Sequence, residues 1–86
     1  MHKLFEEILE LGKAKEHRST LRIHSILEGN PDLFIRHFDA ALYRQFLSGF
    51  EALASSRPSE YRTDGYREEY TRQFEALAYY LNKVIS

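Results

Sequence analysis

The chain contains no cysteine and no tryptophan, and only two prolines and four glycines among its 86 residues. Without cysteine it can form no disulfide, no thiolate nucleophile and no cysteine-based zinc site. No stretch approaches the roughly 20 apolar residues of a membrane-spanning helix. Residues 1–7 lack the apolar run of a secretory signal. The net charge of −1 supplies no overall field that would attract nucleic acid or acidic lipid. These absences predict a cytoplasmic protein that does not contact a membrane.

The composition is that of a small folded domain. Hydrophobic residues make up 43% of the chain and charged residues 29%, values typical of a globular protein rather than a disordered one. Six tyrosines and six phenylalanines supply much of the apolar mass. A chain of this length is close to the lower limit for a self-sufficient core. We therefore expect residues 1–86 to form one domain whose core is rich in aromatic rings.

The last third of the chain carries rings at helical spacing. The apolar positions three or four residues apart are Tyr66, Tyr70, Phe74, Leu77, Leu81 and Val84. Such spacing lines one side of an α-helix. Tyr79 and Tyr80 add rings outside this stripe, and Ile85 extends the apolar surface to the final residues. Because tyrosine is favoured at protein interfaces, we predict that Tyr66, Tyr70, Tyr79, Tyr80 and Ile85 contact another protein chain.

Turn-forming residues divide the chain into three helical blocks. The first spans residues 3–27, as one continuous or gently kinked helix or as two helices that break near 18–20, where Ser19 would cap the second. Gly29, Asn30 and Pro31 predict a helix end, an N-cap and a first helical turn. The second block therefore spans 31–54, and its Ala41 and Gly49 would let a neighbouring backbone approach closely.

The third block begins near Ser59, Thr63 or Asp64, each of which can cap a helix. The chain has no sustained alternation of apolar and polar residues, so strands are not predicted. The expected fold is all-α, an antiparallel three-helix bundle, or a four-helix bundle if the first block breaks. We expect this bundle to associate as a dimer, because a fold of this size would otherwise expose a contiguous apolar patch.

No residue pattern predicts catalysis or a cofactor. The residues three positions before His17, His24 and His37 are not glutamates, so the paired Glu-x-x-His motif of di-metal bundles is missing. Serines and threonines cluster where helices are expected to end, which capping explains. There is no glycine-rich phosphate loop. We therefore predict a protein that is not an enzyme and that binds no metal or cofactor.

An alternative function rests on a basic segment in the first block. Four cations, Lys13, Lys15, Arg18 and Arg22, stand there against the single carboxylate of Glu16, and His24 extends the segment. A cluster of this kind can contact phosphates of nucleic acid. A solvated helix face explains it better, and the arginines of the third block each have a neighbouring carboxylate. Nucleic-acid binding is thus the second choice.

Three short patterns resemble known families. The spacing of Arg18 and His24 resembles that of helical HEPN ribonucleases, in which the pair would imply a phosphate clamp and a general base. The segment from His24 to Gly29 is similar to the phospho-accepting helix of histidine phosphotransfer domains, but Glu28 stands where a lysine is typical and Gly29 falls one position late. The helical pairs are loosely similar to the C-terminal domain of TetR-type repressors, which implies dimerisation and sensing of a small apolar ligand.

The interpretation that agrees best with these patterns is a small non-catalytic protein-interaction module of a bacterial or phage regulator. Its partner would be another protein, a second copy of the chain, or both. The alternatives are a dimerising, ligand-sensing part of a transcriptional regulator and a nucleic-acid-binding protein that uses the basic segment.

Overall fold

The computed structural model describes residues 2–86, and this part of the chain is all-α, as predicted. It contains five α-helices, one short 3₁₀ turn and no strand. The helices are α1 (Lys3–Gly12), α2 (His17–Gly29), α3 (Pro31–His37), α4 (Ala40–Ala54) and α5 (Asp64–Ile85), with the 3₁₀ turn η1 (Pro58–Glu60) before α5. No helix within residues 2–86 combines the length and the apolar character needed to cross a bilayer.

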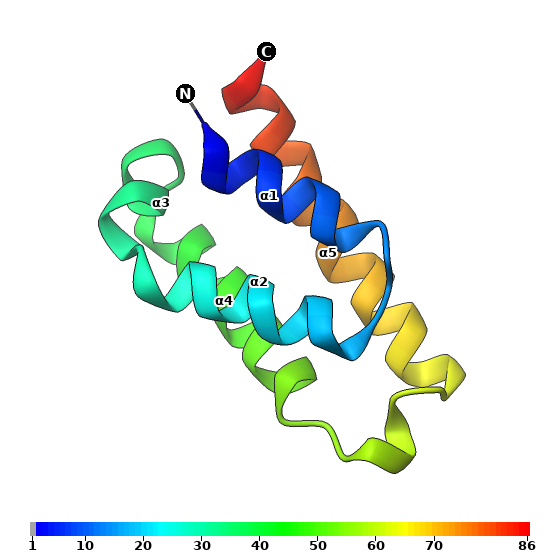
Figure 1. The fold of residues 1–86 in the computed structure, drawn as a ribbon. Coiled ribbons are helices and arrows are strands. Elements are labelled where there is room, and N and C mark those ends of the chain that lie inside the picture. Colours follow the sequence, from blue (N-terminus) through cyan, green and yellow to red (C-terminus); the bar gives the residue numbers. More distant parts are fainter. Residues whose placement is uncertain (1) are drawn as a thin grey trace.

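The helices form two pairs that pack on each other. Figure 1 shows α1 beside α5 with the opposite chain direction, while α2 packs across α4. Helix α2 also contacts α1, and α4 contacts α5, so the two pairs share one core. The short α3 turns the chain from α2 into α4 at one end of the molecule (Figure 1). The two ends of the chain lie at the same end of the α1–α5 pair.

The first block breaks, and it breaks earlier than predicted. Residues 13–16 separate α1 from α2, so the continuous helix over 3–27 is wrong, and so is a break at 18–20. Lys15 adopts a left-handed backbone with φ 53°, which no α-helix contains. Ser19 is buried inside the first turn of α2 and caps nothing, because the N-cap position belongs to Glu16. The change of chain direction at residues 13–16 lets α1 pack on α5 and α2 pack on α4.

The second block also divides. Phe38 has an extended backbone with φ −114°, and Asp39 then caps α4 by accepting a hydrogen bond from the Leu42 amide at 2.6 Å. The predicted helix over 31–54 is therefore two helices, and the bundle of three or four helices becomes five. Pro31 begins α3 as predicted. Asn30 does not cap it with its side chain, which donates instead to the Ile26 carbonyl at 2.9 Å.

The start of α5 follows one of the predicted alternatives. Thr63 is the N-cap, and its hydroxyl accepts a hydrogen bond from the Tyr66 amide at 3.2 Å. This cap fixes the register with which the aromatic stripe of α5 enters the core. Asp64 lies in the first turn, where a carboxylate is favoured by the helix dipole.

Aromatic rings form the centre of the core. Phe5 of α1 lies 5.2 Å from Phe34 of α3, measured between ring centroids, and Phe50 of α4 lies edge-on to Tyr70 of α5 at 6.5 Å. Such offset and edge-on pairs are favourable beyond their buried area. The side chains with under 2% exposure include Phe5, Ile8, Ile23, Leu27, Phe34, Phe50, Tyr70, Leu77 and Leu81. Every helix therefore contributes to one core.

Candidate protein-binding groove

Two of the five residues predicted at an interface lie inside the domain. Tyr66 is 7% exposed and Tyr70 is 1% exposed. The Tyr70 hydroxyl donates to the Gly12 carbonyl at 3.0 Å, and burial raises the pKa of Tyr70 to about 12, so the proton stays on the hydroxyl. Both rings belong to the core of this chain, so in this fold they offer almost no surface for the predicted contact with another protein chain. Helical spacing shows that a stripe is buried, but not which chain buries it.

The other three predicted interface residues lie at or near the surface. Tyr79 is 56% exposed, and the Lys83 ammonium sits 4.4 Å from the centre of its ring. Tyr80 is half-buried and packs edge-on against Phe38 and Phe46, with ring centroids 5.9 Å apart in both pairs. Ile85 is half-buried on the edge of the core. Tyr80 thus has one side in the core and another side free for a contact outside it.

The basic segment does not form one helix face. The loop at 13–16 carries Lys13 and Lys15, while Arg18 and Arg22 lie on α2. Lys13 forms an ion pair with Glu10 at 3.2 Å, and Arg22 forms one with Glu7 at 3.3 Å. Two of the four cations therefore have an ion-pair partner within the domain.

His24 does not extend that segment into solvent. Its side chain is 18% exposed and its Nε2 is buried without a hydrogen-bond partner, 4.0 Å from the carboxylate of Glu28. The residues predicted as a nucleic-acid face are therefore split between a loop and a helix, and His24 is largely covered. The four cations remain exposed, so nucleic-acid binding through them stays a prediction.

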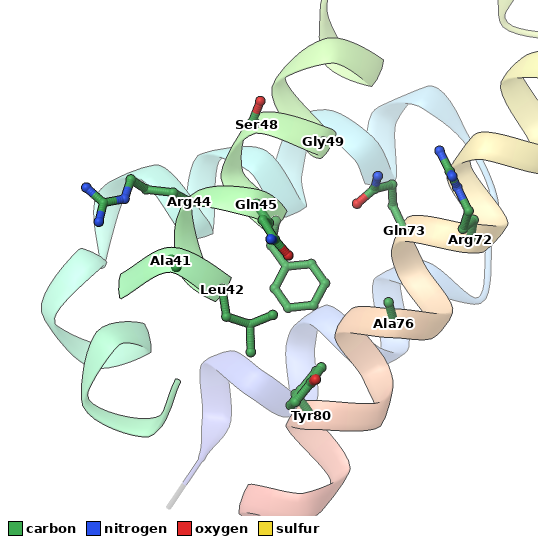
Figure 2. A pocket seen from close by; sticks show the side chains of 11 residues that line it. Ala41, Leu42, Arg44, Gln45, Ser48, Gly49, Arg72, Gln73, Ala76 and Tyr80 are labelled. Atoms are coloured by element: carbon green, nitrogen blue, oxygen red, sulfur yellow. The ribbon is translucent and has the colours of Figure 1, made fainter. Parts of the chain in front are cut away.

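A groove between α4 and α5 has a volume of about 740 Å³. Its lining consists of Ala41, Leu42, Arg44, Gln45, Phe46, Ser48 and Gly49 from α4, and Arg72, Gln73, Ala76 and Tyr80 from α5. Figure 2 shows these two sets of side chains on opposite walls, with Leu42 and Tyr80 towards one end. Small residues on both helices keep the space between the walls open.

The groove changes in character along its length. Leu42, Phe46 and Tyr80 make one end apolar, whereas Gln45, Ser48 and Gln73 supply amides and a hydroxyl further along (Figure 2). The side-chain amide of Gln73 lies directly over Gly49: a Cβ at that glycine would come within 2.4 Å of the amide oxygen. A larger residue at position 49 would therefore displace the Gln73 side chain from this place in the groove.

The groove is bordered by positive charge. Its lining contains Arg44 and Arg72 and no carboxylate. Arg72 is paired with Glu69, which lies outside the groove, and hydrogen bonds from Gln73 and Arg72 hold the pKa of Glu69 below its ordinary value. Arg44 forms no ion pair with any carboxylate of residues 2–86, and its side chain extends away from α5 on the outer side of α4 (Figure 2). A partner that reaches over α4 would meet this uncompensated cation there.

The sequence contains part of the signal for this groove. Ala41 and Gly49, which we expected to permit a close helix approach, do line it, together with Ala76 of α5. What the sequence does not reveal is that no helix of the same chain fills the space beside them. The polar residues at 44, 45, 48, 72 and 73 are ordinary surface residues until α4 and α5 bring them together.

Neither a metal cluster nor a relative points to a different site. Residues 2–86 contain no group of three histidine, aspartate or glutamate side chains placed to hold a metal ion. No protein-family model, curated protein or solved structure matches this chain. The proposal below therefore rests on the geometry and charge of the groove.

Proposed function

We propose that this chain is a non-catalytic protein-interaction module that binds an acidic, amphipathic segment of another protein in the groove between α4 and α5. The observation that carries the proposal is the lining of the groove, which combines an apolar end with two arginines and no carboxylate. Grooves between helices commonly accept an amphipathic helix of a partner. An acidic partner complements the arginines and would be guided towards them during encounter.

The shape of the groove favours a peptide segment over a small molecule. Small-molecule sites enclose most of the ligand and are lined mainly by apolar groups. This groove is an open trough, and about half of its lining residues are polar or charged. Gln45 and Ser48 can exchange hydrogen bonds with polar groups of a peptide, while Ala41 and Ala76 leave room for its backbone. These features support a chain lying along the trough.

Tyr80 is the residue best placed to anchor such a segment. Its ring is held edge-on by Phe38 and Phe46, so little side-chain freedom remains to be lost on binding. Leu42 and Phe46 stand beside it in the groove lining. Rigid aromatic residues in well-packed pockets dominate binding energies at interfaces. We therefore place an apolar side chain of the partner against Tyr80 and Leu42.

A second copy of the chain suits this groove less well than a different protein. In a symmetric dimer through the groove, both surfaces that meet would carry Arg44 and Arg72 and no carboxylate in their lining. Like charges placed together oppose association. The homodimer expected from the aromatic helix is therefore a separate proposal, centred on the exposed Tyr79 rather than on the groove.

A selection experiment tests the binding function directly. A displayed library of amphipathic helices with acidic, neutral or basic polar faces would be selected against the wild-type protein. We expect acidic members to be enriched, and we expect them to lose binding to Arg44→Glu and to keep it for Arg62→Glu, an exposed arginine outside the groove. Enrichment without preference for acidic members, or equal loss with both variants, would contradict the proposal.

A further inference from the structure

The side-chain amide of Gln73 is held in the groove by both helices that form it. Its Nε2 donates to the Glu69 carboxylate at 3.0 Å, one turn earlier on α5. Its Oε1 lies over Gly49 of α4, where an added Cβ would come within 2.4 Å of this oxygen. Figure 2 shows the side chain extending from α5 towards α4. The amide therefore occupies one defined place in the lining of the groove.

The orientation of this amide leaves its oxygen free to accept a hydrogen bond from a partner. A reversed amide would place Oε1 against the Glu69 carboxylate, which is ionised because hydrogen bonds from Gln73 and Arg72 lower its pKa. Within residues 2–86, Gln73 Oε1 accepts no hydrogen bond from another residue. The groove thus presents a hydrogen-bond acceptor of fixed direction between α4 and α5.

A carboxylate of the partner does not match this acceptor, even where the partner as a whole is acidic. An ionised carboxylate only accepts hydrogen bonds, as Gln73 Oε1 does, so the two oxygens would repel each other. The Glu69 carboxylate on the same helix adds a charge of the same sign. Arg72 does not reverse this preference, because its guanidinium already forms an ion pair with Glu69. The partner group that faces Gln73 must therefore be a hydrogen-bond donor.

A side-chain carboxamide has the donor and the acceptor that this place requires. Its NH₂ group can donate to Gln73 Oε1, and its oxygen can accept from the amide of Gln45, which also lines the groove. Gln45 is exposed and makes no side-chain hydrogen bond to another residue within 2–86. An apolar side chain would instead displace water from Gln73 Oε1 without replacing the lost hydrogen bond, which opposes binding.

The two walls of the groove set the distance from this acceptor to the apolar end. On α5, Tyr80 stands seven residues after Gln73, and on α4, Leu42 stands seven residues before Gly49. Seven residues are about two turns and about 10.5 Å of α-helix. Ala76 lies between the two places and leaves room for a larger side chain of the partner. A helix that lies along the trough would therefore face them with side chains seven positions apart.

We infer that the partner segment carries an asparagine or glutamine seven residues from the apolar side chain that contacts Tyr80. This inference rests on the proposed function, because it identifies the partner of the same groove more closely. A single polar residue in an apolar helix contact fixes the register of the two helices. A site that donates or accepts a specific hydrogen bond also rejects ligands that lack the matching group. The carboxamide would thus select among acidic amphipathic helices.

A displayed library of acidic amphipathic helices tests the inference. Each member carries one leucine as the apolar anchor, and the positions seven residues before and seven residues after it are varied among asparagine, glutamine, aspartate and leucine. Both positions are varied because a helix can lie in either direction along the trough. On the wild-type protein we expect a carboxamide to be enriched at one of the two positions. In the enriched helix, aspartate or leucine in place of the carboxamide should raise the Kd about tenfold.

The variant Gln73→Leu connects this preference to one residue. Leucine is similar in size to glutamine and offers no acceptor. We expect Gln73→Leu to bind the leucine form of the helix at least as tightly as the carboxamide form, which reverses the wild-type preference. The matched control is Asn82→Leu, which removes an exposed carboxamide of α5 outside the groove and should keep the wild-type preference. Circular dichroism verifies that both variants are folded.

Three results would overturn the inference. The first is enrichment of acidic helices without a carboxamide preference at either position, which leaves the proposed function intact. The second is a carboxamide preference that persists in Gln73→Leu, because another group would then recognise the carboxamide. The third is a failure of every acidic helix to bind, which contradicts the proposed function and this inference together. The failure of the inference alone is therefore distinguishable from the failure of the proposed function.

Discussion

Gly12 at the end of α1 lies directly against the ring of Phe74 on α5, so that a Cβ at position 12 would come within 1.9 Å of the ring. No side chain fits there without displacement of the ring. The glycine therefore has a packing role, and the break that follows it is part of how α1 reaches α5.

The first prediction is that Gly12→Ala destabilises the domain by about 1–3 kcal/mol, the range for overpacking a core. The matched control is Gly29→Ala, because a Cβ at Gly29 meets nothing within 4 Å. Its helical position should make that change neutral or slightly stabilising. Urea unfolding followed by circular dichroism measures both. Equal stability of Gly12→Ala and the wild type would contradict the close packing of α1 on α5.

The second prediction concerns pH and His17. Its ring stacks on Tyr61 at 3.7 Å and its Nδ1 lies 2.9 Å from the Tyr66 hydroxyl; burial lowers the pKa of His17 below 6.5. The His17 ring is therefore protonated less readily in the folded state than in the unfolded chain. The contribution of the neutral ring to the free energy of unfolding is complete above about pH 6.5, and it is lost as the pH falls towards the lowered pKa.

The variant that tests this is His17→Phe, which keeps a ring on Tyr61 but cannot titrate. Between pH 7.5 and 5.5 we expect the melting temperature of the wild type to fall more than that of His17→Phe. Thermal scans by circular dichroism give both slopes. If the two slopes are the same, the neutral His17 ring contributes nothing to the pH dependence.

The third prediction is that Lys15→Gly leaves the domain as stable as the wild type or more stable, by up to about 1 kcal/mol. Glycine adopts the left-handed backbone of this position without steric cost, which offsets its greater freedom in the unfolded chain. A clear loss of stability in urea would show that the Lys15 side chain is needed by the fold.

The fourth prediction separates Tyr79 from Tyr80. If the chain associates with itself through the exposed end of α5, Tyr79→Glu should shift sedimentation velocity profiles towards the monomer while helicity is retained. Tyr80→Glu should destabilise the fold instead, because a charge would be placed against Phe38 and Phe46. A wild type that sediments as a monomer at high micromolar concentration would refute self-association.

Helix class and several helix ends could be predicted from the sequence, because they depend on local chemistry. The Thr63 hydroxyl caps α5, and Pro31 begins α3 because it has no amide hydrogen to leave unpaired. Each effect involves only groups within one helical turn of the residue. The breaks at residues 13–16 and at Phe38–Asp39 differ from the prediction. Gly12 adjoins the first, but one glycine does not by itself end a helix, and the second has no proline or glycine beside it. Both breaks are favoured by packing between helices distant in the sequence.

The site was harder to predict, for a related reason. Periodicity places Tyr66 and Tyr70 on an apolar stripe, but the paths of α2 beside Tyr66 and of α1 beside Tyr70 decide that this chain buries them itself. The sequence indicates Ala41 and Gly49 as places of close approach, yet the groove beside them depends on the separation of α4 and α5.

The central proposal is tested most directly by the affinity of one selected acidic helix for two variants in which a native alanine is replaced by glutamate. Ala76 is exposed and lines the groove, whereas Ala52 is exposed on α4 outside it. Fluorescence anisotropy with the labelled helix compares Ala76→Glu, Ala52→Glu and the wild type at the same ionic strength. We expect Ala76→Glu to raise the Kd at least about tenfold, because it fills the trough and repels the acidic partner, and Ala52→Glu to leave it within about twofold. Equal Kd values for the two variants would contradict binding in the groove between α4 and α5.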